Sequence, residues 1–132
     1  MFRPLLVSLL VAASAVAVHT QDSRTGAGAQ SFGEAVLKMK DAKQFSEMYQ
    51  QKFDVSMKKQ MSEQQWIAAA TQVAQQTGEN KRRTLATADQ SSGAYRFRYN
   101  STYENGRAFD DIYLVRQGDT WKVVGIWVRP AQ

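Results

Sequence analysis

The stretch from Gly93 to Arg129 constrains the fold most, because it alternates between aromatic and polar residues and contains two short turn sequences. In residues 94–104 the aromatic side chains recur at every second position, which is typical of a half-buried strand. Asn105-Gly106 suits a two-residue type I′ turn, and Gly118-Asp119 suits a type II′ turn. The sequence therefore predicts three consecutive antiparallel strands.

Counting outward from these two turns, with Glu104 opposite Arg107, sorts the strand residues onto two faces. One face grades from an aromatic and aliphatic centre to a polar end, in five rows: Tyr95, Arg116 and Trp121; Phe97, Leu114 and Val123; Tyr99, Ile112 and Gly125; Ser101, Asp110 and Trp127; Tyr103, Ala108 and Arg129. The other face mixes charged and apolar side chains: Arg96, Arg98, Asn100, Phe109, Asp111, Tyr113, Val115, Lys122, Val124, Ile126 and Val128.

The N-terminal residues have the pattern of a secretory leader. Arg3 precedes an apolar run from Leu5 to Val18, and Ala15-Val16-Ala17 supplies small residues at a cleavage site. The run is shorter than the roughly 20 apolar residues that cross a bilayer, so we expect no transmembrane segment in the mature form. We predict a periplasmic or extracellular protein with three parts: a cleaved signal peptide over 1–17, a flexible lead-in over 18–30 and a single domain over 31–132.

The composition excludes several kinds of chemistry. Of the 132 residues 43% are hydrophobic, which is ample for the core of one domain, and none is cysteine, which excludes disulfides and thiolate sites. His19 is the one histidine and lies beside the predicted cleavage site, so the mature chain lacks an imidazole for a catalytic triad. We expect no cofactor and no metal. The net charge of +5 is diffuse, and Lys81-Arg82-Arg83 indicates a solvated strand end rather than a nucleic-acid site.

Two sequences of capping-box type predict helices before the strands. The first begins at Ser31, and the apolar spacing over 35–53 fits one long helix or two short ones broken near Asp41. The second begins at Ser62, and its apolar face continues until Gly78 ends the helix. The helices therefore precede the predicted strands along the chain.

Residues 84–90 predict a fourth strand, so we expect an α+β fold with N-terminal helices packed on a four-stranded antiparallel meander. Together with the ending 121–125 (Trp-Lys-Val-Val-Gly), this arrangement resembles the cone of nuclear-transport-factor-2-like and cystatin-like proteins. From about 34 to 128 the chain is similar to a family of small exported bacterial proteins, domain of unknown function 4019, in the spacing of Trp66, Gly78, Arg83, Gly93-Ala94-Tyr95, Phe97 and Asp110. The resemblance implies a fold and an exported bacterial setting, and it brings no established activity.

Asp110 is the centre of the candidate pocket, at the polar end of the first face, together with Tyr99, Ser101, Tyr103, Trp127 and Arg129. In a cone this end is a pocket mouth, where a carboxylate against aromatic rings has a raised pKa and can take up a proton. The alternative, which we favour, is that Asp110 pairs with Arg107 or Arg129 and closes the sheet end. Asp111 points to the opposite face, so the two carboxylates form no catalytic pair.

Three functions remain open. The leading hypothesis is a non-enzymatic exported domain that binds another protein, or itself as a weak homodimer, through the mixed face: Arg96, Arg98, Phe109, Tyr113, Val124, Ile126 and Val128. The second is a small-ligand carrier that uses the pocket around Asp110. The third is an enzyme of the isomerase or dehydratase type with Asp110 as its lone base.

The leader generates the first prediction: the exported protein begins close to Val18, since an Ala-x-Ala exit follows a charged start and a short apolar core. Intact-mass measurement or N-terminal sequencing of the secreted protein checks this. A mature protein that still carries Arg3 and Leu5 contradicts it.

Overall fold

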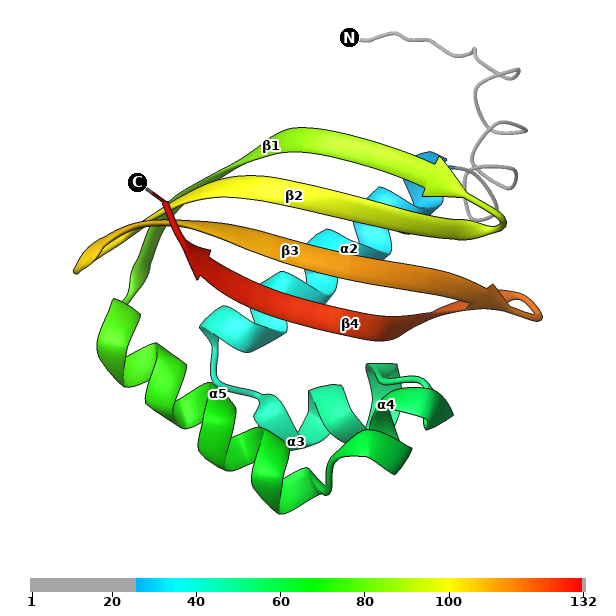
Figure 1. The fold of residues 1–132 in the computed structure, drawn as a ribbon, viewed down its shortest axis with the longest axis horizontal. Coiled ribbons are helices and arrows are strands. Elements are labelled where there is room, and N and C mark those ends of the chain that lie inside the picture. Colours follow the sequence, from blue (N-terminus) through cyan, green and yellow to red (C-terminus); the bar gives the residue numbers. More distant parts are fainter. Residues whose placement is uncertain (1–25, 132) are drawn as a thin grey trace, which may run out of the picture.

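A computed structural model describes residues 26–131, so the predicted leader and the lead-in up to residue 25 lie outside the described residues. The helical elements are α2 (Gly26–Asp41), α3 (Phe45–Glu47), the π-helical turn η1 (Met48–Lys52), α4 (Val55–Gln60) and α5 (Glu63–Thr77). The strands that follow are β1 (Asn80–Ser91), β2 (Ala94–Tyr103), β3 (Gly106–Gln117) and β4 (Thr120–Pro130), and they form one antiparallel sheet in sequence order. The predicted α+β meander is confirmed (Figure 1). Among the described helices none is long and apolar enough to cross a membrane.

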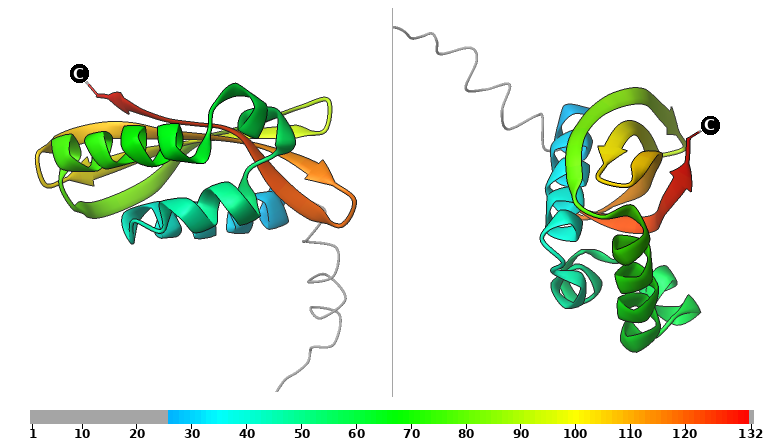
Figure 2. Two further views of the ribbon diagram at one scale, coloured as in Figure 1. Left: turned by 90° about the horizontal axis from the view of Figure 1, so that it is seen from below. Right: turned by 90° about the vertical axis from the view of Figure 1, so that its left-hand side faces the viewer.

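The sheet is strongly curved, and the helices cover only part of it (Figures 1 and 2). Helix α2 lies along one face, while α3, α4 and α5 gather beside the β4 edge. A backbone bridge between Phe53 and Val123 attaches this helical group to β4, and the Asp54 amide donates to the Val123 carbonyl at 2.8 Å. We call the sheet face opposite α2 the outer face.

Helix α2 begins earlier than predicted. It starts at Gly26, so Ser31 lies inside the helix and caps nothing, and residues 26–30 of the predicted lead-in are helical. Packing explains the difference, because Ala29 is fully buried and Gly33 brings the helix close to the sheet. A Cβ on Gly33 would lie 3.5 Å from Ile112 and Leu114 side chains.

The other helix boundaries agree with the sequence. The chain breaks after Asp41, where Lys43 takes a positive φ of 61°, and this confirms the version with two shorter helical segments. Ser62 caps α5: its hydroxyl accepts from the Gln65 amide at 3.1 Å, while the Gln65 side chain accepts from the Ser62 amide at 2.8 Å. Gly78 ends the helix with a φ of 73°.

The β2–β3 turn lies one residue earlier than predicted, which shifts the pairing of the two strands by two residues. Tyr103 pairs with Gly106, so Glu104 and Asn105 form the loop and Glu104 does not lie opposite Arg107. A shift of two leaves every side chain on its predicted face, because strand side chains alternate with period two.

Contacts at the hairpin tip explain this shift. The Glu104 amide donates to the Glu79 carbonyl at 2.8 Å, and the Asn105 amide donates to the Thr77 carbonyl at 2.9 Å. The tip is therefore held against the end of α5. The preference of Asn-Gly for a type I′ turn takes no account of these contacts with a distant segment.

The β3–β4 hairpin keeps its predicted turn and then changes register. Gln117 pairs with Thr120 around Gly118-Asp119, as predicted, and Leu114 pairs with Val123. Tyr113, however, pairs with Gly125, so one extra residue, Val124, forms a bulge in β4.

The bulge moves every later β4 side chain to the opposite face, because a slip of one residue inverts the alternation. Trp127 pairs with Asp111, and Val128 pairs with Asp110. The prediction was therefore wrong for the second half of β4: Trp127 and Arg129 leave the pocket face for the outer face, while Ile126 and Val128 leave the predicted interface.

Gly125 follows the bulge directly, and the Trp127 indole lies against it. A Cβ on Gly125 would come within 2.3 Å of the indole ring, so a larger residue there would require the Trp127 side chain to move. The ring also packs edge-on against Tyr113, with centroids 4.8 Å apart. Gly125 and the bulge together set the position of Trp127 on the outer face.

The packing of β2 against α2 generates a stability prediction. Phe97 is only 1% exposed and lies between Tyr95 and the α2 glycine Gly33, so Phe97→Ala should lower the free energy of unfolding by about 3–5 kcal/mol. Leu85 on β1 is 40% exposed, and Leu85→Ala should change it by less than about 0.5 kcal/mol. Urea denaturation of both variants checks this, and equal losses contradict the assigned sheet faces.

Candidate functional site

Asp110 on β3 lies at the centre of a buried polar network, and its side chain is completely inaccessible to solvent. Its Oδ2 accepts hydrogen bonds from Ser101 Oγ at 2.5 Å, Tyr103 OH at 2.7 Å and Arg83 Nη2 at 3.0 Å. On the other side, Lys40 Nζ lies 3.4 Å from Oδ1 and donates to the Tyr103 hydroxyl at 2.9 Å. Four elements, α2, β1, β2 and β3, thus meet at one carboxylate.

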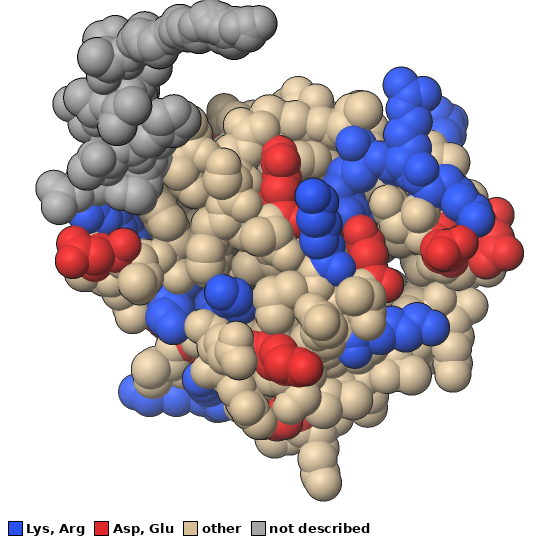
Figure 3. Space-filling model, turned by 180° about the vertical axis from the view of Figure 1, so that it is seen from behind, with Lys and Arg blue, Asp and Glu red and all other residues tan. Residues whose placement is uncertain are grey.

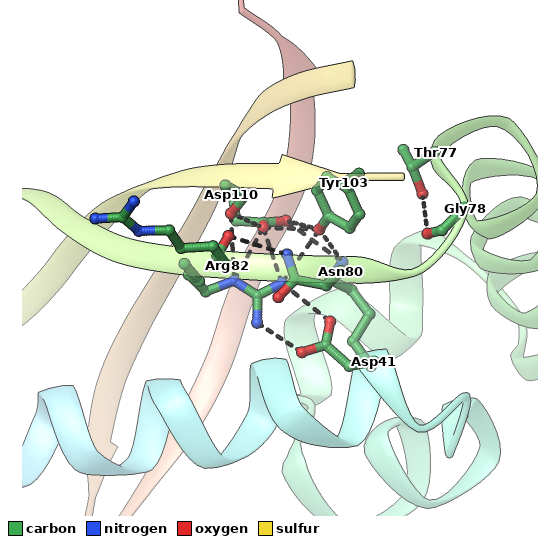
Figure 4. A network of polar contacts seen from close by, with 10 residues as sticks. Asp41, Thr77, Gly78, Asn80, Arg82, Tyr103 and Asp110 are labelled. Carbon is green, nitrogen blue, oxygen red and sulfur yellow. Dashed lines mark hydrogen bonds and ion pairs between the residues drawn. The ribbon is translucent and has the colours of Figure 1, made fainter. Parts of the chain in front are cut away.

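Arg83 extends this network to the end of α2. Its guanidinium donates to both carboxylate oxygens of Asp41, at 2.7 and 3.0 Å, while it also contacts Asp110. Figure 4 shows Asp41 reaching from α2 toward the strands, where Tyr103 and Asp110 lie side by side. We call Lys40, Asp41, Arg83, Ser101, Tyr103 and Asp110 the Asp110 network.

The electrostatics keep Asp110 ionised. Burial by itself raises the pKa of its carboxyl, but the charges of Lys40 and Arg83 and the hydrogen bonds from Ser101 and Tyr103 outweigh burial, so the pKa lies below its ordinary value. Burial and the adjacent carboxylate raise the pKa of the Tyr103 phenol. An ionised, fully engaged carboxylate is a hydrogen-bond acceptor and a poor proton acceptor.

The Asp110 network differs from the predicted pocket in its members. Ser101 and Tyr103 contact Asp110 as expected, but Tyr99 donates instead to Glu34 at 3.0 Å. Trp127 and Arg129 lie on the outer face, because of the β4 bulge. The favoured pairing of Asp110 was right in kind and wrong in its partners, which are Arg83 and Lys40 in place of Arg107 and Arg129.

The sequence interpretation missed Lys40, Asp41 and Arg83. A partial signal for Arg83 was present, because strand alternation puts Arg82 and Arg83 on opposite faces, so that one of the two faces the helices. Lys40 and Asp41 carry no such signal, since α2 is remote from the sheet in sequence and its rotation depends on packing.

A cleft of about 590 Å³ opens beside the Asp110 network, between α5, the end of α2 and β4. Its α5 wall consists mainly of small side chains: Ala69, Ala70, Val73, Ala74 and Thr77. Larger apolar residues complete the walls: Phe45, Met61, Trp66, Ile126, Trp127 and Val128. Because the side chains of one wall are short, the space between α5 and the sheet stays unfilled.

Polar groups gather at one end of the cleft. Lys40 and Tyr103 line it from the Asp110 network, and Glu79 and Glu104 lie at the hairpin side. Seen from the α2 side, acidic and basic side chains surround a hollow at one end of the molecule (Figure 3). The cleft therefore combines apolar walls with a hydrogen-bonding end.

The outer face is organised around a second buried carboxylate, Asp111. Arg98 Nε donates to Oδ1 at 2.8 Å, and Arg129 Nε donates to Oδ2 at 2.9 Å. Each arginine also lies over an aromatic ring: Arg98 over Phe109 at 4.7 Å and Arg129 over Trp127 at 5.8 Å. On this face, arginines therefore cover aromatic rings and pair with a shared carboxylate.

No cluster of histidine, cysteine or acidic side chains within residues 26–131 has the arrangement of a metal site. The model of the family "Protein of unknown function (DUF4019)" matches residues 32–126. The chain belongs to this family, which confirms the resemblance to it, and the matched region contains the greater part of α2, all of α3, α4 and α5, most of the sheet, and both Asp110 and Asp111. Comparison with curated proteins gave no match.

The Asp110 network generates a prediction for stability and its pH dependence. Asp110→Asn leaves Arg83 and Lys40 without their buried counter-charge and should lower the free energy of unfolding at pH 7 by about 3–5 kcal/mol. Since the pKa of Asp110 is lowered on folding, its contribution is present above about pH 4, the ordinary range of an unfolded aspartate, and is lost as the pH falls through the folded-state pKa.

Urea denaturation of the wild type and the variant between pH 7 and pH 3 checks this. The difference between the two proteins should shrink at the acid end. Asp111→Asn serves as the matched control, because its arginine partners are about half exposed and solvent replaces part of the interaction, so its loss should be smaller. Equal losses for the two variants contradict the special role of Asp110.

Proposed function

We propose that this member of the DUF4019 family is a small exported carrier that binds a compact, largely apolar molecule in the cleft. The cleft itself carries the proposal: about 590 Å³ lies between α5 and the sheet and falls within the range of small-molecule sites. A core-forming helix ordinarily fills such a space with larger side chains, since unfilled volume costs stability. The small α5 residues keep it open.

The two ends of the cleft suit different parts of a ligand. Trp66, Val73 and Ile126 supply apolar contact area in the body of the cleft. Lys40 and Tyr103 supply a cation and a hydroxyl at its polar end, held in position by Asp110. We infer that the ligand carries one hydrogen-bonding group on an apolar body.

The environment of Asp110 supports binding over catalysis. A lone base needs a carboxylate within reach of a substrate and a pKa near the working pH. Asp110 is inaccessible to solvent, engaged by five donor atoms from four residues, and has a lowered pKa. We therefore place the isomerase hypothesis below the carrier, with Asp110 in a structural role.

The outer face supports protein docking less than the sequence suggested. Of the apolar residues assigned to that patch, Ile126 and Val128 lie on the other face after the bulge. Phe109 and Tyr113 are half-buried beneath Arg98 and Arg96, whose guanidiniums lie 4.7 and 5.4 Å from the ring centroids. A contiguous apolar patch, which was the reason for expecting a protein partner or a homodimer, is thus broken up by charge.

Filling the cleft tests the proposed function. Ala74→Phe on α5 should place a ring in the cleft and weaken binding of the apolar anion 1-anilinonaphthalene-8-sulfonate at least about tenfold, because ring and ligand compete for the same volume. Binding is followed by probe fluorescence and by emission of Trp66 and Trp127, which both line the cleft.

Ala68→Phe is the matched control, since Ala68 lies on the same helix but is exposed and outside the cleft. It should bind the probe as the wild type does. A wild type that does not bind the probe, or a loss that is the same in both variants, contradicts the carrier proposal.

A further inference from the structure

The outer face holds most of the net positive charge of the described chain. Residues 26–131 contain 15 Lys and Arg and 11 Asp and Glu, an excess of four positive charges. Strand pairing places five arginines, one lysine and two carboxylates on the outer face, a net charge equal to this excess of four: Arg82, Arg96, Arg98, Arg107, Lys122 and Arg129, with Asp89 and Asp111.

Three of these arginines are ion-paired with the two carboxylates of the face itself. Arg96 pairs with Asp89 at 3.3 Å, and Arg98 and Arg129 share Asp111 at 2.8 and 2.9 Å. The other two, Arg82 and Arg107, make no ion pair with any residue in the described range.

Arg82 and Arg107 lie in one row across the sheet. Each pairs with Thr102, Arg82 from β1 and Arg107 from β3, so their Cα atoms are two strand spacings apart, about 10 Å. Both side chains are exposed. The two guanidiniums repel each other because no described carboxylate pairs with either of them. An anion bound between them would relieve that repulsion.

A hollow of about 320 Å³ lies between these two arginines. Hydroxyl and amide side chains line it, together with one aromatic ring and one alanine that follows β4: Thr84, Asn100, Thr102, Phe109 and Ala131. Within residues 26–131 no carboxylate lines this hollow, and none of its lining residues in that range also lines the cleft beside α5. It is therefore a separate site with separate chemistry.

We propose that this hollow binds an acidic sugar, that is, a hydroxyl-rich ring that carries a carboxylate. The planar guanidinium presents paired N–H donors that match a carboxylate. The threonine and asparagine groups both donate and accept, as sugar hydroxyls require. Phe109, held from one side by Arg98, offers an apolar surface to the C–H face of a sugar ring.

The test uses titration calorimetry of the exported protein with tri-galacturonic acid as the probe. The wild type should bind it, and the double variant Arg82→Gln/Arg107→Gln should bind at least about tenfold more weakly. The control Lys38→Gln/Lys59→Gln removes the same charge from exposed positions on α2 and α4, and its affinity should stay within about twofold. Single Arg107→Gln, an exposed substitution, should show an intermediate loss.

Competing ligands separate sugar recognition from charge alone. Neutral galactotriose and inorganic phosphate should each bind at least about tenfold more weakly than tri-galacturonic acid. Binding of phosphate or a DNA oligonucleotide as tight as that of the acidic trisaccharide overturns the proposal, and so does an equal loss in the lysine control or no binding by the wild type. Ala74→Phe should leave this affinity unchanged, so failure of the cleft proposal is distinguishable from failure of this one.

Discussion

The need to compensate one buried charge connects most of this structure. Asp110 is removed from water entirely, and an ionised carboxylate survives there only with opposite charges and hydrogen-bond donors around it. Lys40 and Arg83 supply the charges, and Ser101 and Tyr103 supply the remaining bonds. Since these residues come from α2, β1 and β2, the requirement sets how the first helix lies against the sheet.

The cleft beside α5 depends on that arrangement. Lys40 and Tyr103 line its polar end, so the Asp110 network forms part of the cleft and positions both groups. The hairpin tip at Glu104 and Asn105 closes the same end by bonding to Glu79 and Thr77. The polar end of the cleft is thus the end held by hydrogen bonds. Along α5 the wall consists mainly of short side chains, which leave the cleft unfilled.

The outer face follows a different design, because its carboxylate Asp111 is reached by arginines that remain partly in water. Arg98 and Arg129 cover aromatic rings with their guanidiniums and so turn an apolar sheet face into a cationic one. In the Thr102 row this ion pairing stops, and Arg82 and Arg107 make no ion pair among the described residues. The two proposed sites, a mainly apolar cleft and a hollow between arginines, thereby lie on different parts of one small domain.

The sequence by itself determined what depends on neighbouring residues: the alternation of β2, the Ser62 cap and Gly78 end of α5, and the Gly118 turn. These features are local, since hydrogen bonds and φ preferences act within a few residues. The same logic correctly placed Asp110 among Ser101 and Tyr103. The sequence also identified the family, because the order and spacing of the family's residues can be read along the chain without its structure.

Only the tertiary structure decided which distant segments meet. The bulge at Val124 reversed the faces of Ile126 to Arg129, because a single inserted residue inverts an alternation that a turn count extends unchanged. Lys40 and Asp41 reached Asp110 and Arg83 because packing of Ala29 and Gly33 sets the rotation of α2. Such pairings join residues far apart in the chain, and their energy depends on burial, which no local pattern of residues records.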